Sequence, residues 1–262
     1  MKRFLIIAAL FCCISTINAD AQTDQRTLTT KIADLLAKVP YTDAAQSEKN
    51  MQAIADMGQK GIEEMSLMLA APGKGDNTAV QYALNGFSYY TTKPGKGDLK
   101  KWSETAYLNA LEKTSDKENK AFIIRQLQTT GSDASVASLK NYLSDERLCD
   151  PAARALVKIN TPAAGKALLT ALTASSGNNQ LTLTEALGDM RYREAAPVIA
   201  KYTTSADNKL AKLALYSLAY IADPASEPVL AGAAAKSGFA YETTDATASY
   251  IKYAGQLAAN GK

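Results

Sequence analysis

Residues 154–172 read RALVKINTPAAGKALLTAL, and this pattern returns twice further along the chain. Residues 185–203 read EALGDMRYREAAPVIAKYT, and residues 216–234 read YSLAYIADPASEPVLAGAA, so each stretch starts 31 residues after the one before. Apolar residues return at matching positions of the three stretches: Leu156, Leu187 and Leu218; Ala167, Val198 and Val229; Leu168, Ile199 and Leu230. A period near 30 that is held over several positions indicates an array of structural repeats.

The same period extends towards the N-terminus. Residues 125–127 (RQL) precede residues 154–156 (RAL) by 29 positions, and residues 53–54 precede the similar residues 83–84 by 30. Each period contains two stretches with apolar residues at helical spacing and none with the alternation that is typical of strands. The sequence therefore predicts an all-α fold, a right-handed α-solenoid of about seven antiparallel helix pairs between roughly residues 26 and 260.

Two breaks between helices carry capping chemistry. Thr161-Pro162 and Asp223-Pro224 each place a side-chain oxygen directly before a proline. Such an oxygen accepts hydrogen bonds from the first N–H groups of a helix, and proline fits the first helical position because its missing N–H is not needed there. We therefore expect a helix to begin at each proline. Small residues on the stripe that faces the neighbouring pair predict close helix packing: Ala155, Ala186, Ala214 and Ala219.

Several periods carry residues in the order of a known repeat motif, whose second helix reads roughly Asp-Pro-x-Val-Arg-x-x-Ala-x-x-Ala-Leu. The matching residues are Asp145, Leu148, Ala152, Ala155 and Leu156 in one period and Asp207, Leu210, Ala214, Ser217 and Leu218 in another, with a looser match at Asp116, Ile123 and Leu127. In these residues the chain resembles HEAT repeats of the phycobilisome-lyase type, over about residues 44–236. The resemblance implies a helical scaffold, and it carries no chromophore chemistry to any residue of this chain.

One position departs from the family pattern. The arginine of the motif is replaced in successive periods by Lys120, Cys149, Gln180 and Ala211. This arginine belongs to the Asp–Arg ladder that ties neighbouring HEAT repeats together. Because the ladder is mostly missing, we expect the stack to rely on apolar packing.

The first residues of the chain predict export. Lys2 and Arg3 precede an apolar run over residues 4–14, and residues 19–21 (ADA) fit a small-x-small cleavage site. We therefore expect residues 1–21 to be a signal peptide, residues 22–262 to form the HEAT-like α-solenoid domain, and the product to be periplasmic or secreted. The apolar run is shorter than the roughly 20 residues of a membrane-spanning helix, and no later stretch predicts a membrane span. Lipid attachment at Cys13 is disfavoured, because the residues before it are not small.

The composition excludes several classes of function. Lys and Arg number 29 against 26 Asp and Glu, a formal charge of +3 that is too even for electrostatic binding of nucleic acid. The chain has no histidine, and so lacks the commonest general base and metal ligand. We predict a non-enzymatic protein with no catalytic residues, cofactor or metal. Of the three cysteines only Cys149 follows the signal peptide, and its apolar neighbours predict a buried thiol.

A candidate interaction patch lies in the stretch where the period lengthens. Pro-Gly-Lys-Gly-Asp occurs at residues 72–76 and again at residues 94–98. Neither copy has the Gly-x-x-x-x-Gly-Lys-Ser/Thr spacing of a phosphate-binding loop, so we expect solvated turns whose Asp caps the next helix. Aromatic residues between and beside these turns are of the kind enriched at protein interfaces. The candidate patch consists of Tyr89, Tyr90, Trp102, Lys74 and Lys96, whereas Phe87 and Tyr107 fall on apolar stripes and are expected in the core.

These observations lead to two hypotheses of function. The first is an exported, non-enzymatic helical scaffold whose surface binds a protein partner or an attached domain. The second follows from a further resemblance in signal peptide, repeat type and composition, to helical modules of exported Gram-negative proteins that precede a 3-keto-disaccharide hydrolase domain. That resemblance implies an accessory module in a carbohydrate context, with the catalytic domain outside these residues.

Overall fold

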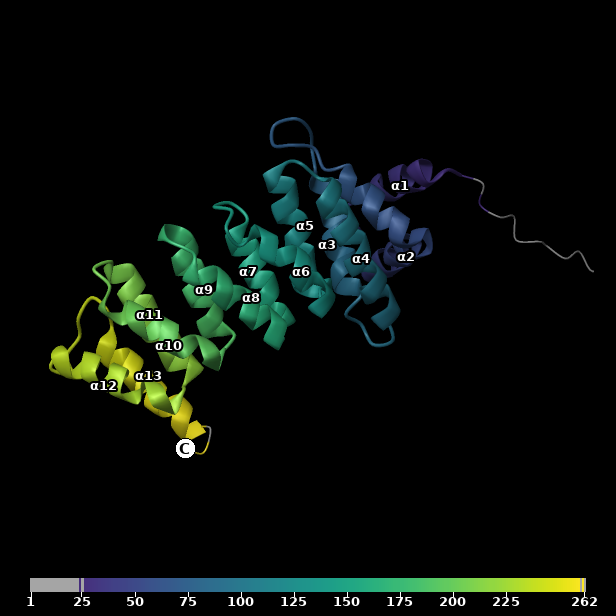
Figure 1. Cartoon of the computed structure of the whole chain (residues 1–262). Helices are drawn as coiled ribbons and strands as arrows, with labels where there is room; N and C mark the ends of the chain where they lie inside the picture. Colours follow the sequence, from purple (N-terminus) through teal and green to yellow (C-terminus); the bar gives the residue numbers. More distant parts are fainter. Residues whose placement is uncertain (1–23, 25, 260, 262) are drawn as a thin grey trace, which may run out of the picture.

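The computed structural model describes residues 24, 26–259 and 261 and is all-helical over this part of the chain. The helices follow one another along an elongated body, from α1 at one end to α13 at the other (Figure 1), and no strand occurs among the described residues. The α-helices are α1 (Leu28–Leu36), α2 (Ala44–Leu67), α3 (Thr78–Tyr90), α4 (Gly97–Lys113), α5 (Lys117–Thr130), α6 (Val136–Leu139), α7 (Cys149–Ile159), α8 (Pro162–Thr173), α9 (Gly177–Asp189), α10 (Ala196–Ile199), α11 (Asn208–Ile221), α12 (Glu227–Lys236) and α13 (Ala246–Ala259). The 3₁₀ helices are η1 (Asp133–Ser135), η2 (Lys140–Tyr142), η3 (Arg193–Ala195), η4 (Ala200–Thr204) and η5 (Pro224–Ser226).

The two longest helices of the described part, α2 with 24 residues and α4 with 17, lie near its N-terminal end. α2 packs against α3 and α4, and α1 packs against α2. α2 changes direction at Gly58, whose φ of 65° lies in the left-handed region that glycine adopts without steric conflict. This kink divides α2 into two helical segments that meet different neighbours.

From α5 onwards, the helices α5, α7, α9, α11 and α13 each pack against the next one in this series. α5 contacts α7, α7 contacts α9, α9 contacts α11, and α11 contacts α13; we call these five the stacked helices. The leucines of the repeated triplets are fully buried at these contacts: Leu127, Leu156, Leu187 and Leu218. The predicted all-α architecture with packing between neighbouring helices is thereby confirmed, while the right-handed superhelix and the number of pairs stay predictions.

Two of the segments between the stacked helices are short and irregular. η1, α6 and η2 together span residues 133–142, and η3, α10 and η4 span residues 193–204. Leu139 and Ile199 are fully buried and hold these segments on the core. We expected two regular helices in each period, but in these two periods 3₁₀ turns flank a single α-helical turn, as is common for short connecting pieces.

Both predicted caps are present. Thr161 Oγ1 accepts a hydrogen bond from a backbone N–H at 3.3 Å, and α8 begins at Pro162. Asp223 Oδ1 accepts from a backbone N–H at 3.1 Å, and helical structure begins at Pro224 with η5, which leads into α12. The small residues of the predicted stripe are buried as well: Ala155, Ala186, Ala214 and Ala219.

Ion pairs join α5 to the turn before α7, although the arginine of the motif is missing. Lys117 Nζ lies 2.8 Å from Asp145 Oδ2, and Arg147 forms an ion pair with Glu118. Each pair joins residues at corresponding ends of neighbouring repeats. Solvent screens pairs that are this exposed, so their contribution to stability is small. The expectation that the stack relies on apolar packing is therefore incomplete, because charged contacts supplement that packing here.

α9 and α11 approach each other closely at Gly188. A Cβ atom at this position would lie 2.8 Å from the Cα atom of Ser217 on α11. Ser217 Oγ also donates a hydrogen bond to the carbonyl oxygen of Thr184 at 3.0 Å, so a polar contact accompanies the close packing. The two helices can lie at this distance because residue 188 has no side chain.

The predicted signal peptide, residues 1–21, lies outside the described residues. None of the helices in the described part of the chain combines the length and the apolar character that a membrane crossing needs.

Candidate interaction surface

One exposed face of the stacked helices carries large polar and aromatic side chains. The first residue of each repeated triplet lies on this face: Arg125 on α5, Arg154 on α7, Glu185 on α9 and Tyr216 on α11. Successive residues of a helix point about 100° apart, so the first residue of a triplet faces solvent while its leucine faces the core. With the residue one helical turn later on each helix, we define the repeat ridge as Arg125, Thr129, Arg154, Lys158, Glu185, Asp189, Tyr216 and Tyr220.

The middle of the repeat ridge alternates in charge. Arg154 Nε lies 2.9 Å from Asp150 Oδ1 on its own helix, and a hollow of about 200 Å³ separates this pair from Glu185 and Asp189 on α9. The hydrogen bond with Asp150, supported by both α9 carboxylates, raises the pKa of Arg154 above its usual value. A basic segment on α7 therefore lies beside an acidic segment on α9.

The α11 part of the repeat ridge is aromatic. The rings of Tyr216 and Tyr220 have centroids 4.4 Å apart, and the Lys252 ammonium of α13 lies 4.8 Å from the Tyr220 centroid. Tyrosines on this face present both a flat apolar ring and a hydroxyl group.

At its other end the repeat ridge continues into a hollow of about 370 Å³ between α3 and α5. We call this the α3–α5 pocket. Its polar lining residues are Gln81, Asn85, Tyr89, Arg125, Gln126, Gln128 and Thr129. Gln81, Asn85 and Tyr89 are spaced four residues apart on α3 and so share one face of that helix.

The predicted patch is not one surface, which corrects the expectation from sequence. Of its five residues, only Tyr89 lies in the α3–α5 pocket. Tyr90 is buried at 3% exposure, because neighbouring residues of a helix point in different directions. Trp102 is half-buried, with its ring centroid 5.6 Å from that of Phe87. Lys74 lies in the exposed loop before α3, at the opposite end of this helix from Lys96.

Tyr90 and its cationic neighbours instead form a covered aromatic site. The ammonium groups of Lys93 and Lys96 lie 5.0 Å and 4.6 Å from the Tyr90 ring centroid. Lys93 Nζ also lies 2.5 Å from Glu48 Oε2. Two of the predicted residues, Tyr90 and Lys96, are thus brought together, in a contact that holds the loop after α3 against the body of the protein.

The remaining predictions for this region are partly confirmed. Phe87 and Tyr107 are fully buried, as expected from their apolar stripes. Asp76 Oδ1 accepts a hydrogen bond from the backbone N–H of Thr78 at the start of α3, although the N-cap position itself is Asn77. Asp98 lies inside the first turn of α4 and not at its cap, because α4 begins at Gly97, two residues earlier than a cap at Asp98 requires.

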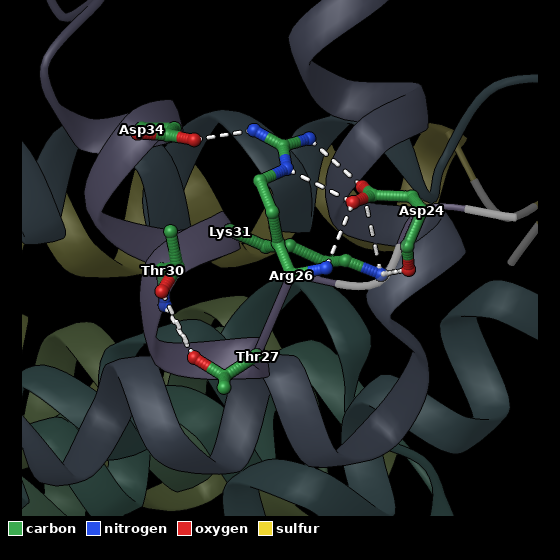
Figure 2. A network of polar contacts seen from close by, with 6 residues as sticks. All are labelled: Asp24, Arg26, Thr27, Thr30, Lys31 and Asp34. Atoms are coloured by element: carbon green, nitrogen blue, oxygen red, sulfur yellow. Dashed lines mark hydrogen bonds and ion pairs between the residues drawn. The ribbon is translucent and has the colours of Figure 1, made fainter. Parts of the chain in front are cut away.

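A second polar cluster lies at the N-terminal end. Figure 2 shows Arg26 between Asp24 and Asp34, with the ammonium of Lys31 also close to Asp24. Thr27 Oγ1 accepts from the backbone N–H of Thr30 at 3.2 Å and so caps α1. A hollow of about 600 Å³ between α1 and α2 adjoins this cluster. Its charges are largely paired with one another.

Cys149 is 1% exposed, and burial raises the pKa of its thiol to about 12. The predicted buried cysteine is thereby confirmed. The described residues contain no group of three or more Asp, Glu, Cys or His side chains that is placed to hold a metal ion.

In comparisons with known proteins, no family model matches this chain and no curated protein sequence matches it. The resemblance to HEAT repeats therefore stays an expectation from the sequence.

Sequence reasoning missed the α3–α5 pocket and the repeat ridge. The signal was present in the triplets at residues 125, 154, 185 and 216, where the leucine is constant while the first residue changes from Arg to Glu to Tyr. A position that varies beside a constant core position indicates an exposed face. The amides of the pocket gave no such signal, because their meeting depends on how α3 packs against α5.

Proposed function

We propose that this chain is an exported, non-enzymatic helical-repeat scaffold of HEAT-like α-solenoid architecture, which binds a protein partner or an attached domain along the repeat ridge. One observation carries the proposal: the equivalent exposed position of successive stacked helices bears Arg125, Arg154, Glu185 and Tyr216. Arg and Tyr are the residue types enriched at interface hot spots. Repeat arrays use such extended surfaces for binding.

The chemistry of the repeat ridge suits a partner with a matching order of charges. A partner segment along it would meet a basic group on α7, acidic groups on α9 and tyrosine rings on α11. This order supplies specificity, since like charges opposite each other are strongly disfavoured at an interface. It supplies affinity where the tyrosine rings become buried.

The test compares two variants of the mature chain, residues 22–262. The ridge variant carries Arg154→Ala and Tyr216→Ala, and the matched control carries Lys166→Ala and Lys201→Ala, which lie on α8 and η4 away from the repeat ridge. All four side chains are exposed, so both variants should keep the helical circular dichroism spectrum. Each immobilised protein is incubated with periplasmic and secreted proteins of the organism of origin, and bound proteins are identified by mass spectrometry.

A protein retained by the wild type and the control but lost from the ridge variant is the expected result. Equal retention by all three proteins, or no specific retention, would contradict the proposal. Retention of a 3-keto-glycoside hydrolase in this way would support the second hypothesis, an accessory module of a carbohydrate-active enzyme.

A further inference from the structure

Two of the amide side chains that line the α3–α5 pocket, Gln126 and Asn85, have their orientation fixed by buried hydrogen bonds. Gln126 is 3% exposed, and its Nε2 donates to the carbonyl oxygen of Phe122 at 3.2 Å and to Asn85 Oδ1 at 2.8 Å. A carbonyl oxygen can only accept, so this contact assigns the nitrogen and oxygen of the Gln126 amide. Gln126 Oε1 in turn accepts from Ser88 Oγ at 3.0 Å.

This arrangement also assigns the amide of Asn85. Because Asn85 Oδ1 accepts the hydrogen bond from Gln126, its NH₂ group is left to donate, and it has no partner among the described residues. Asn85 is exposed, so a ligand can reach this group. The pocket therefore presents an oriented donor, and the cost of ordering that donor has already been met in the unbound protein.

Arg125 gives the pocket a positive charge. Arg125 is the one charged residue in the lining of the pocket. Among the described residues, no carboxylate forms an ion pair with it. The nearest carboxylates are engaged elsewhere, since Glu118 pairs with Arg147 and Asp150 pairs with Arg154. A guanidinium group is always charged in proteins and binds carboxylates through two parallel hydrogen bonds.

The spacing of the amides matches an extended peptide. Gln81 and Asn85 are one helical turn apart on α3, a rise of about 6 Å. Alternate residues of an extended chain are about 6.6 Å apart and present their backbone groups in the same direction. Each carboxamide offers both a donor and an acceptor, as a backbone amide does. The ring of Tyr89, 69% exposed, supplies an apolar surface at the end of this row.

We infer that the α3–α5 pocket binds an extended acidic segment of the partner protein, with a Glu or Asp carboxylate on Arg125 and its main chain on Gln81 and Asn85. This inference rests on the proposed function and names the chemistry of the partner at one end of the repeat ridge. A saccharide that carries a carboxylate is the competing ligand, and the experiment separates the two.

The experiment measures binding of a fluorescein-labelled peptide, Gly-Ser-Glu-Ser-Glu-Ser-Gly, to the mature chain by fluorescence anisotropy. The comparison ligands are the same peptide with Gln in place of Glu, and trigalacturonate as competitor. The variants are Arg125→Gln and Asn85→Asp. Asn85→Asp keeps the acceptor for Gln126 but replaces the outward donor with an oxygen, so the fold is retained while the recognition group is inverted. Asn141→Asp, an exposed residue of η2, is the matched control.

We expect the acidic peptide to bind, the Gln peptide to bind at least about tenfold more weakly, and both pocket variants to lose between about ten- and a hundredfold in affinity, as for hydrogen bonds to charged groups. Asn141→Asp should bind like the wild type. Binding of trigalacturonate with no binding of the peptide would overturn the inference in favour of a saccharide. Peptide binding that is unchanged in both variants, or no binding of any probe, would overturn it outright. If the inference fails while the ridge variant still loses a partner, the proposed function stands.

Discussion

Replacement of Gly188 by alanine should separate α9 from α11. A Cβ atom at residue 188 would lie 2.6 Å from Ser217 Oγ, 2.7 Å from Ser217 Cβ and 2.8 Å from Ser217 Cα. A different rotamer of Ser217 moves its hydroxyl but not its Cα, so the conflict is with the backbone of α11. Carbon atoms in contact lie about 3.5–4.0 Å apart, and the two helices must therefore move apart by roughly 1 Å.

Two opposing effects decide how Gly188→Ala changes the free energy of unfolding. Alanine is favoured over glycine inside a helix by about 1 kcal/mol. An added methyl group in a well-packed core costs typically about 1–3 kcal/mol, and the upper part of this range applies because the obstacle is backbone. We therefore expect Gly188→Ala to lower the free energy of unfolding by about 1–2 kcal/mol.

Two other glycines serve as matched controls, because their replacement by alanine should raise the free energy of unfolding. Gly232 on α12 and Gly255 on α13 are exposed helical glycines, and an added Cβ would meet nothing within 4 Å at either. Gly232→Ala and Gly255→Ala should therefore stabilise their helices by up to about 1 kcal/mol. The assay is urea unfolding followed by far-UV circular dichroism, with linear extrapolation. If Gly188→Ala is as stable as Gly232→Ala, the close approach of α9 and α11 is refuted.

Three further predictions follow from buried and charged groups. Cys149 in the native protein should react with a water-soluble thiol reagent at least about a hundredfold more slowly than in urea, because the thiol is buried and its pKa is raised. Rapid labelling of Cys149 in the native protein would contradict its buried placement. The pKa values of Glu118 and Asp145 are lowered by their ion-pair partners, so the stability that these carboxylates contribute is present above about pH 5 and is lost as pH falls through the lowered pKa values. Because the chain has no histidine, the urea midpoint should be nearly constant from about pH 6 to 8 and should fall in acid. A urea midpoint that rises in acid would refute this sign. Glu104 is buried and accepts hydrogen bonds from Ser132 and Ser135, so Glu104→Gln should lower the free energy of unfolding by about 1–3 kcal/mol, and an unchanged urea midpoint would show that these bonds do not matter.

Much of the fold could be read from local pattern. The leucines of the repeated triplets, the capping residues Thr161 and Asp223, and the burial of Cys149 all follow from residues that are close together in the chain. Helical periodicity and capping depend on interactions within a few residues, so they appear in the sequence directly. The same local reasoning failed for Tyr90, because two adjacent tyrosines look alike in sequence while their directions on α3 differ.

The sequence by itself determined that this chain is a helical array with a repeated core, and where many of its helices begin. The tertiary structure decided which polar residues meet. Gln126 lies beside Ser88 and Asn85, about forty positions earlier in the chain, and its hydrogen bond to Asn85 orients the Asn85 donor of the α3–α5 pocket. The physical reason is that apolar burial follows a simple period, whereas a polar site requires particular atoms within hydrogen-bond distance, and that distance is set only when α3 and α5 pack together.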